Sequence, residues 1–256
     1  GEGSGLSLDT DRFDPLYHHL ILWNISNGEI AGSYRFGYGS ELFDEKGKPS
    51  GFYTGSLLKF GPDAPGILRK SMELGRAFVV PKYQKEVLPL KMILGGLCVG
   101  TTFRSGVDRC IGLVSFSAAL PEFFKSLLVR FLEKYYMLPD GGRFTKAAHP
   151  YRCDFLRVDP DALLESTGPD IDAFDRLLGA MSDGAFRIPV LARKYFNCGA
   201  KATCFNIDPT FSNCLDAMIV LRLRDFPQPS IKSFVRSVPQ QMQERVLRHF
   251  YGESLG

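Results

Sequence analysis

The feature that most constrains the fold is a hairpin signal near the start of the chain. Asn27-Gly28 separates two apolar runs, residues 20–25 and 30–36. Asn-Gly between such runs is the strongest short signal for two antiparallel strands joined by a tight turn. The sequence therefore predicts a β-hairpin at the beginning of the folded part.

Strand and helix signals then alternate. Residues 72–80 predict a strand that ends at Pro81, and a helix follows that begins at 86 or 87 and runs to 99. Pro89 suits its first turn, where a missing N–H costs little. A further strand is predicted over 110–117. A hairpin followed by this alternation predicts an α/β fold with a central mixed β-sheet flanked by helices.

The second half of the chain continues this mixture. Apolar residues spaced by three and four predict helices, and the expected elements are helices over 122–136, 172–181, 189–198 and 240–251 with strands over 201–206 and 217–223. Residues 37–66 are rich in Gly and Pro and indicate a long connection with one short helix. We interpret 1–14 as a tag or linker and 140–150 as an internal linker. The rest, 15–256, is predicted to be a single domain with a C-terminal helical extension.

Composition excludes several function classes. Of 256 residues, 45% are hydrophobic and 23% charged, which is ordinary for a soluble globular protein. The net charge of +3 is too small to indicate nucleic acid, and no apolar run reaches the length of about 18 residues that a membrane span needs. No signal peptide, nucleophile elbow or nucleotide-binding glycine loop is visible. The six cysteines show no metal-ligand spacing, so we expect buried thiols, no metal site and a cytoplasmic protein.

Short motifs in a fixed order carry a family resemblance. Glu73-Leu74-Gly75-Arg76 is similar to the Glu-x-x-Arg strand of acyl-homoserine lactone synthases and of ornithine- and glycine-lipid N-acyltransferases. Further segments that fit the second group are Gly32-Ser33-Tyr34-Arg35, Val114-Ser115-Phe116-Ser117, residues 188–195, Gly199-Ala200-Lys201, Asp208-Pro209-x-Phe211 and Asp216. With the hairpin, they make residues 15–225 resemble a GNAT-superfamily acyltransferase of the ornithine- and glycine-lipid type.

The resemblance implies an amino-acid N-acyltransferase. The α-amine of glycine, ornithine or a similar amino acid would take a 3-hydroxyacyl group from acyl carrier protein, which gives an N-acyl amino acid lipid precursor. A separate O-acyltransferase would add a second chain. No cofactor would stay bound, because acyl carrier protein or acyl-CoA arrives and leaves as the donor. The basic residues near the C terminus are expected on a solvated terminal helix, with attraction to the inner face of the cytoplasmic membrane as the alternative.

The expected donor region departs from the GNAT pattern. GNAT enzymes commonly place Arg/Gln-x-x-Gly-x-Gly/Ala at a helix start, where backbone N–H groups hold the pyrophosphate of coenzyme A. Residues 83–89 contain no glycine. We therefore expect a carrier-protein donor, with altered activity as the alternative. Lys82, Lys85 and Lys91 would form a dock for its acidic surface, or they are simply a solvated charged face. The residues expected along the donor path are Phe78, Val79, Val80, Gln84, Lys85, Val87 and Leu88.

Glu73 and Arg76 are the candidate catalytic residues. The attacking amine must lose a proton, and a carboxylate with a raised pKa can accept it. Alternate residues of a strand face opposite sides, so Glu73 and Arg76 meet only where the strand bulges, which Gly75 permits. The alternative is that each pairs with a neighbour in the sheet. Backbone N–H groups of 78–80 are expected to stabilise the oxyanion if the strand opens there.

Four residues are candidates for binding the amino acid. Arg35 suits bidentate contact with its carboxylate, or it pairs with Glu73, or it is simply solvated. Ser115 and Ser117 share one strand face and would line the substrate cleft, or they are small polar residues near a strand end. Asp208, with Asp216, would bind the amine, or Asp208-Pro209 only starts a turn.

The sequence leaves two other functions open. An acyl-homoserine lactone synthase shares the Glu-x-x-Arg strand and would use S-adenosylmethionine. A non-catalytic domain that binds acyl carrier protein or lipid is favoured slightly by the missing glycines.

Overall fold

A computed structural model of the protein describes residues 10–153 and 159–252. These residues divide into two compact units. The hairpin unit comprises residues 10–55, 65–112 and 221–252, and the β7–β8 unit comprises 56–64 and 113–220 within the described ranges. Strands β5 (Arg109–Phe116) and β8 (Cys214–Arg222) each contribute residues to both units.

The hairpin unit is built on a mixed sheet. Strands β1 (His18–Asn24) and β2 (Glu29–Tyr38) pair antiparallel, and Gly28 in the turn has φ +71°, which only glycine adopts easily. Strand β4 (Ser71–Val79) pairs antiparallel with β2, and the first half of β5 runs parallel to it, from Ser71↔Arg109 to Leu74↔Gly112.

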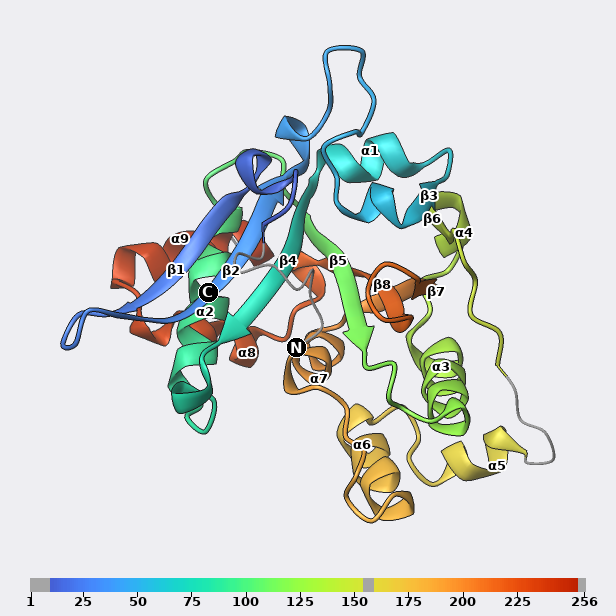
Figure 1. Cartoon of the computed structure of the whole chain (residues 1–256). Coiled ribbons are helices and arrows are strands. Elements are labelled where there is room, and N and C mark those ends of the chain that lie inside the picture. The colour runs from blue at the N-terminus through green and yellow to red at the C-terminus, as the bar shows by residue number, and fades with distance from the viewer. Residues whose placement is uncertain (1–9, 154–158, 253–256) are drawn as a thin grey trace. The chain divides into compact units, whose positions relative to one another are not determined.

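Helix α2 (Leu88–Thr101) contacts β1, β2 and β4, and it also packs against α8 (Gln228–Phe234) and α9 (Gln240–Tyr251) (Figure 1). Two adjacent glycines make this close approach possible. A Cβ on Gly95 would lie 2.4 Å from the carbonyl oxygen of Phe234, and one on Gly96 would lie 2.9 Å from Leu20 Cδ2. The shorter elements involving this unit are η1 (Asp14–Leu16), η2 (Gly39–Glu41), η3 (Thr54–Ser56), α1 (Ala64–Arg69), η4 (Pro81–Tyr83), η5 (Leu223–Asp225) and η6 (Val235–Ser237).

The β7–β8 unit pairs β7 (Lys201–Asp208) antiparallel with β8, whose residues are buried up to Leu221. Helix α3 (Glu122–Tyr136) packs on β7, and its Phe131 ring stacks on Phe174 of α6 (Ile171–Met181) with centroids 4.0 Å apart. The remaining elements of this unit are β3 (Leu58–Phe60), α4 (Gly141–Phe144), β6 (Thr145–Ala147), α5 (Pro160–Glu165) and α7 (Val190–Asn197).

The predicted α/β class is confirmed, as are the hairpin, the strand–helix–strand order after it, and the main later helices and strands. Three predictions about individual segments were wrong. Residues 37–66 hold β3, η2, η3 and the start of α1 rather than one short helix. Residues 140–150 are not a linker, because β6 pairs with β3 and the His149 N–H donates to Asn206 Oδ1 at 2.8 Å. Strand β8 begins at Cys214 instead of 217.

The predicted N-terminal linker is corrected in part. Residues 10–14 belong to the hairpin unit, where Asp11 and Asp14 bind Arg35, while residues 1–9 lie outside the described residues. That the chain forms a single domain stays a prediction. In the described part of the chain, no helix has both the length and the apolar character that a bilayer span needs.

Candidate functional site

Glu73 lies in the middle of the buried half of β4, and only 1% of it is exposed. Its carboxylate accepts hydrogen bonds from the Tyr17 hydroxyl, from the Tyr53 N–H at 3.0 Å and from the Thr54 N–H at 2.8 Å. Burial raises the pKa of Glu73, while these donors act in the opposite direction. The candidate base is therefore enclosed and fully hydrogen-bonded, and it reaches no substrate directly in this arrangement.

Arg35 lies on β2 opposite Gly75 and is 2% exposed. Its Nη1 contacts both carboxylate oxygens of Asp11, at 2.8 and 2.9 Å, and Asp14 Oδ1 at 2.6 Å. Burial acts to raise the pKa of Asp11, but the bonds and charge of Arg35 outweigh it, and the pKa is lowered. Two of the interpretations of Arg35 were wrong. It is neither solvated nor paired with Glu73, because carboxylates of the N-terminal segment hold it. Its contact with a substrate carboxylate stays a prediction.

Arg76 occupies a bulge between β2 and β4. The register shifts where Arg35↔Gly75 gives way to Ser33↔Phe78, and Arg76 has φ +49°. The bulge that a direct contact between Glu73 and Arg76 would require is therefore present. The residue with the left-handed backbone conformation is Arg76 and not Gly75. The Arg76 guanidinium binds Asp11 at 3.1 Å, so Arg35 and Arg76 share one carboxylate.

The expected donor region begins where β4 ends. Phe78 is half exposed, and Val87 and Leu88 at the start of α2 are 65% and 55% exposed. Gln84 donates to the Val79 carbonyl at 2.7 Å, and the Val80 N–H donates to the Ala31 carbonyl at 3.0 Å. Pairing with β2 continues through Val79, whereas the parallel pairing of β4 with β5 ends at Leu74. The oxyanion role of 78–80 stays a prediction.

The first turn of α2 leaves its N–H groups without a side-chain cap, because Val87 occupies the N-cap position. Lys82, one of the three predicted docking lysines, is bound to Glu29. An uncapped helix start beside exposed apolar side chains suits an anionic group that carries an apolar chain.

A second polar cluster lies in the β7–β8 unit. The exposed Ser115 donates from Oγ to Asp216 Oδ1 at 2.6 Å, and Cys214 Sγ donates to the same oxygen at 3.5 Å. Asp216 is 1% exposed, and burial, helped by the nearby Asp208, raises its pKa to about 6. The ligand atoms of Asp208, Cys214 and Asp216 lie within 4.8 Å of one another. Cys214 carried no signal in the sequence.

The other predicted substrate residues have local roles. Asp208 is 2% exposed, and its Oδ1 accepts from the N–H and the hydroxyl of Thr210 at 2.8 and 2.7 Å. It therefore starts a turn, as the alternative predicted, while lying beside Asp216. Ser117 lies one residue after β5, and its Oγ accepts from the Ala119 N–H at 3.2 Å in a surface turn.

Residues 1–94 match the sequence model of the acetyltransferase (GNAT) domain. This stretch contains Arg35, Glu73 and Arg76, so the carboxylate-and-guanidinium cluster of the hairpin unit lies within the part of the chain that matches this domain model. The predicted resemblance to the GNAT superfamily is confirmed.

The chain is similar to three bacterial Nα-acyltransferases. It is 32% identical over 148 residues to a glycine Nα-acyltransferase of Bacteroides thetaiotaomicron, in a match that spans 53% of this chain and 43% of that protein. It is 25% identical to a glycine Nα-acyltransferase of Phocaeicola vulgatus, across 94% of this chain and 78% of that protein. It is 28% identical to an L-ornithine Nα-acyltransferase of Rhodobacter capsulatus, across 70% and 69%.

Two solved structures show distant likeness. The CoA-dependent acyl-homoserine lactone synthase MesI superposes with a TM-score of 0.39 at 12% identity, over 92% of this chain and 75% of that chain. A second such synthase, BjaI with SAM and isopentyl-CoA, gives 0.29 at 15% identity, over 46% and 51%. Scores this low carry no argument about the site.

Proposed function

We propose that this protein is an N-acyltransferase that moves a 3-hydroxyfatty acyl group from acyl carrier protein to the α-amine of glycine or ornithine. The observation that carries the proposal is the similarity to glycine and ornithine Nα-acyltransferases, one of which matches 94% of this chain. The GNAT match over 1–94 supports acyl transfer as the reaction class. The product would be an N-acyl amino acid, a lipid precursor on which a separate O-acyltransferase could act.

The start of α2 is the proposed donor site. A phosphopantetheine arm ends in one phosphate, which suits the uncapped N–H groups of the first helical turn. Phe78, Val87 and Leu88 offer exposed apolar surface beside it for the rest of the arm. Tyr83–Pro89 lacks glycine and so offers no close backbone approach for a pyrophosphate. These features support a carrier-protein thioester over coenzyme A as the donor.

The cluster of Ser115, Asp208 and Asp216 is the proposed site for the amine. A carboxylate with a pKa near 6 is ionised at neutral pH and is still basic enough to accept a proton during the attack. Ser115 bonds to Asp216 and is exposed, so its hydroxyl can pass the proton from the amine to the buried carboxylate. As the amine nitrogen bonds to the thioester carbon, the carbon–sulfur bond breaks and the pantetheine leaves as a thiolate. The thiolate takes up a proton from solvent, and Asp216 returns to solvent the proton that it received.

Glu73 is proposed to act by positioning. Its carboxylate accepts three hydrogen bonds, from Tyr17 just after η1 and from Tyr53 and Thr54. These bonds fix the position of β4, the strand that leads to the donor site. Arg35 of β2 and Arg76 of β4 both bind Asp11. Loss of these groups would disturb donor binding through the position of β4.

The test is direct. Purified protein is incubated with 3-hydroxypalmitoyl-carrier protein or 3-hydroxypalmitoyl-CoA and a pool of amino acids, and the products are identified by mass spectrometry. A single N-acyl amino acid made from the carrier-protein donor supports the proposal. Product only with S-adenosylmethionine added would indicate a lactone synthase. No product, beside an active relative as a control, would favour a non-catalytic binding domain.

A further inference from the structure

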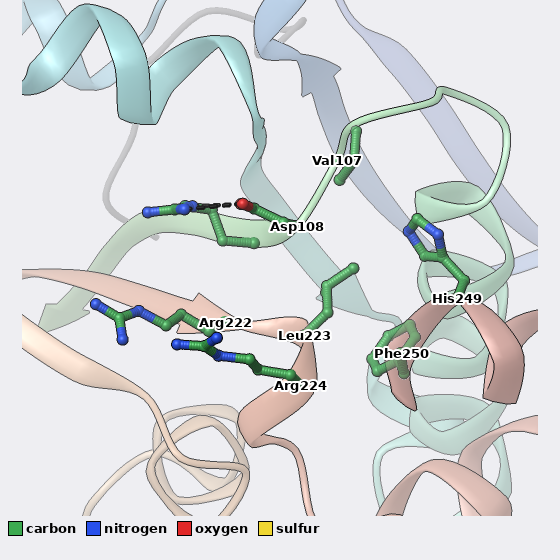
Figure 2. Close-up of a pocket in the computed structure, with 8 residues that line it drawn as sticks. Val107, Asp108, Arg222, Leu223, Arg224, His249 and Phe250 are labelled. Atoms are coloured by element: carbon green, nitrogen blue, oxygen red, sulfur yellow. Dashed lines mark hydrogen bonds and ion pairs between the residues drawn. The ribbon is translucent and has the colours of Figure 1, made fainter. Parts of the chain in front are cut away.

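A basic cleft of about 360 Å³ lies in the hairpin unit, away from the residues considered so far (Figure 2). Three short stretches of chain form it: the start of β5, the end of β8 with η5, and the last turn of α9. Its lining residues are Val107, Asp108, Arg109, Arg222, Leu223, Arg224, His249 and Phe250. Its volume falls in the range of about 300–1,000 Å³ that small-molecule sites occupy.

The local backbone turns two arginines to one side of the cleft. Leu223 is buried, and its N–H donates to the Asp108 carbonyl at 2.9 Å, which joins η5 to the start of β5. Arg222 and Arg224 flank it and both line the cleft, and Figure 2 shows their side chains extending in the same direction. Two like charges that line one cleft repel each other, and a bound anion would relieve that repulsion.

Positive charge exceeds negative charge in this cleft. Arg109 is bound by Asp108 through two contacts, at 2.5 and 2.9 Å, so this pair is neutral. Arg224 forms an ion pair with Asp225 at 3.7 Å, and both side chains are exposed to solvent. The half-buried Arg222 side chain makes no ion pair or hydrogen bond with any residue in 10–153 or 159–252. Its guanidinium therefore keeps its donors for a ligand.

His249 of α9 adds a further unused polar atom. His249 lines the cleft, and its Nε2 is buried and has no hydrogen-bond partner among the described residues. Buried polar atoms are rarely left unpaired, so an unpaired one beside a cavity indicates a missing partner. Leu223 and Phe250 supply an apolar wall next to it.

We propose that this cleft binds a phosphate group, carried by a small phosphate ester or by a lipid headgroup. Guanidinium groups present two parallel N–H donors that match phosphate oxygens, and they remain charged at every physiological pH. The cleft is separate from the proposed donor site. Ser71 at the start of β4 pairs with Arg109, and β4 then runs to Val79, so roughly 25 Å of strand lies between the two sites.

The test is calorimetric titration of the whole chain with inorganic phosphate at constant ionic strength in a phosphate-free buffer. We expect saturable binding to one site. The double variant Arg222→Ala/Arg224→Ala should weaken it by about tenfold or more, because charge-assisted hydrogen bonds are lost. The matched control is Lys46→Ala/Lys48→Ala, which removes two exposed positive charges of the same unit outside the cleft. It should bind phosphate as the parent does.

Vesicle sedimentation then identifies the source of the phosphate. Phosphatidylcholine vesicles with and without phosphatidic acid are compared for the parent and both double variants. Retention on phosphatidic acid vesicles that the Arg222→Ala/Arg224→Ala variant loses assigns a lipid headgroup, and phosphate binding without vesicle binding assigns a soluble ester. The proposal is overturned if the parent binds neither probe, or if the control variant loses as much binding as the cleft variant. Acyl transfer enters neither measurement, so the result is independent of the proposed reaction.

Discussion

The hydroxyl of Tyr17 donates a hydrogen bond to the carboxylate of Glu73, which lies 56 positions later in the chain. Burial raises the pKa of both groups, and the neighbouring charge of Glu73 raises that of Tyr17 further. Tyr17 therefore stays protonated and acts as a donor. The bond joins the start of β1 to the middle of β4, and it holds the candidate carboxylate where water does not reach it.

Tyr17→Phe should lower the free energy of unfolding by about 1–3 kcal/mol, because it removes one donor from a buried carboxylate. Urea denaturation at pH 7 measures this. Tyr38→Phe is the matched control. Its hydroxyl is also buried and donates to the neutral Gly100 carbonyl at 2.8 Å, so it should cost only about 1 kcal/mol. Equal losses in the two variants would show that Glu73 is not charged in the folded protein.

The buried Arg35 depends on two carboxylates, so Asp11→Asn/Asp14→Asn should destabilise the fold by about 3–5 kcal/mol at pH 7. The pKa values of both aspartates are lowered in the folded protein. Their contribution is therefore complete above the ordinary pKa of about 4 and is lost as pH falls through the lowered values. Denaturation curves at pH 7 and pH 3 should show a large difference between parent and variant at pH 7 and a smaller one at pH 3. Glu45→Gln, an exposed change in the same unit, should match the parent at both.

Local sequence signals predicted the main helices and strands because the turn residues and apolar spacing that favour each of them lie within the element itself. The Asn27-Gly28 hairpin and the apolar face of α3 are examples. Strands β3 and β6 have three residues each, which is too short for a period-two pattern, and they form only because distant segments pair. The last strand was predicted to begin only after Asp216, because an aspartate in the sequence is typical of a loop. The structure buries Asp216 within β8, where Ser115 donates a hydrogen bond to it.

The candidate site likewise combines residues that a sequence motif identified with partners that no local signal indicated. The Glu-x-x-Arg motif identified Glu73 and Arg76, but nothing near them in sequence indicated their partners. Asp11 lies in a small, polar segment that resembles a linker, and Tyr53 lies in an irregular connection. Contacts between residues so far apart depend on the completed fold, so local sequence patterns cannot predict them.

Arg76 is held in a left-handed backbone conformation that a residue with a Cβ adopts at a cost of about 1–2 kcal/mol. Both Arg76→Gly and Arg76→Ala remove the guanidinium, but only glycine removes this cost. The glycine variant should therefore be more stable than the alanine variant by about 1 kcal/mol in urea denaturation. If the guanidinium positions β4 for donor binding, both variants should show the same rise in KM for the acyl donor. A KM change that follows stability instead would assign Arg76 to the fold alone.

Asp216 makes the sharpest pH prediction, because its pKa is raised to about 6 by burial. The proposed base must be ionised, so kcat/KM of the parent should rise with pH and level off above about 6. Ser115→Ala removes a bond that stabilises the charge and should move this midpoint to higher pH. Asp216→Asn should remove the rise and most of the activity, while Glu165→Gln, an exposed change in the same unit, should preserve both.

Stability gives an independent check of the same group. The folded pKa lies above the unfolded value of about 4, so the unfolded chain loses its proton first as pH rises. The parent should therefore lose about 3 kcal/mol of folding free energy between about pH 4 and pH 6, a loss that Asp216→Asn should not show. A parent and an Asp216→Asn variant with parallel stability curves would mean that the carboxylate titrates normally. The rise in kcat/KM would then have to come from another group.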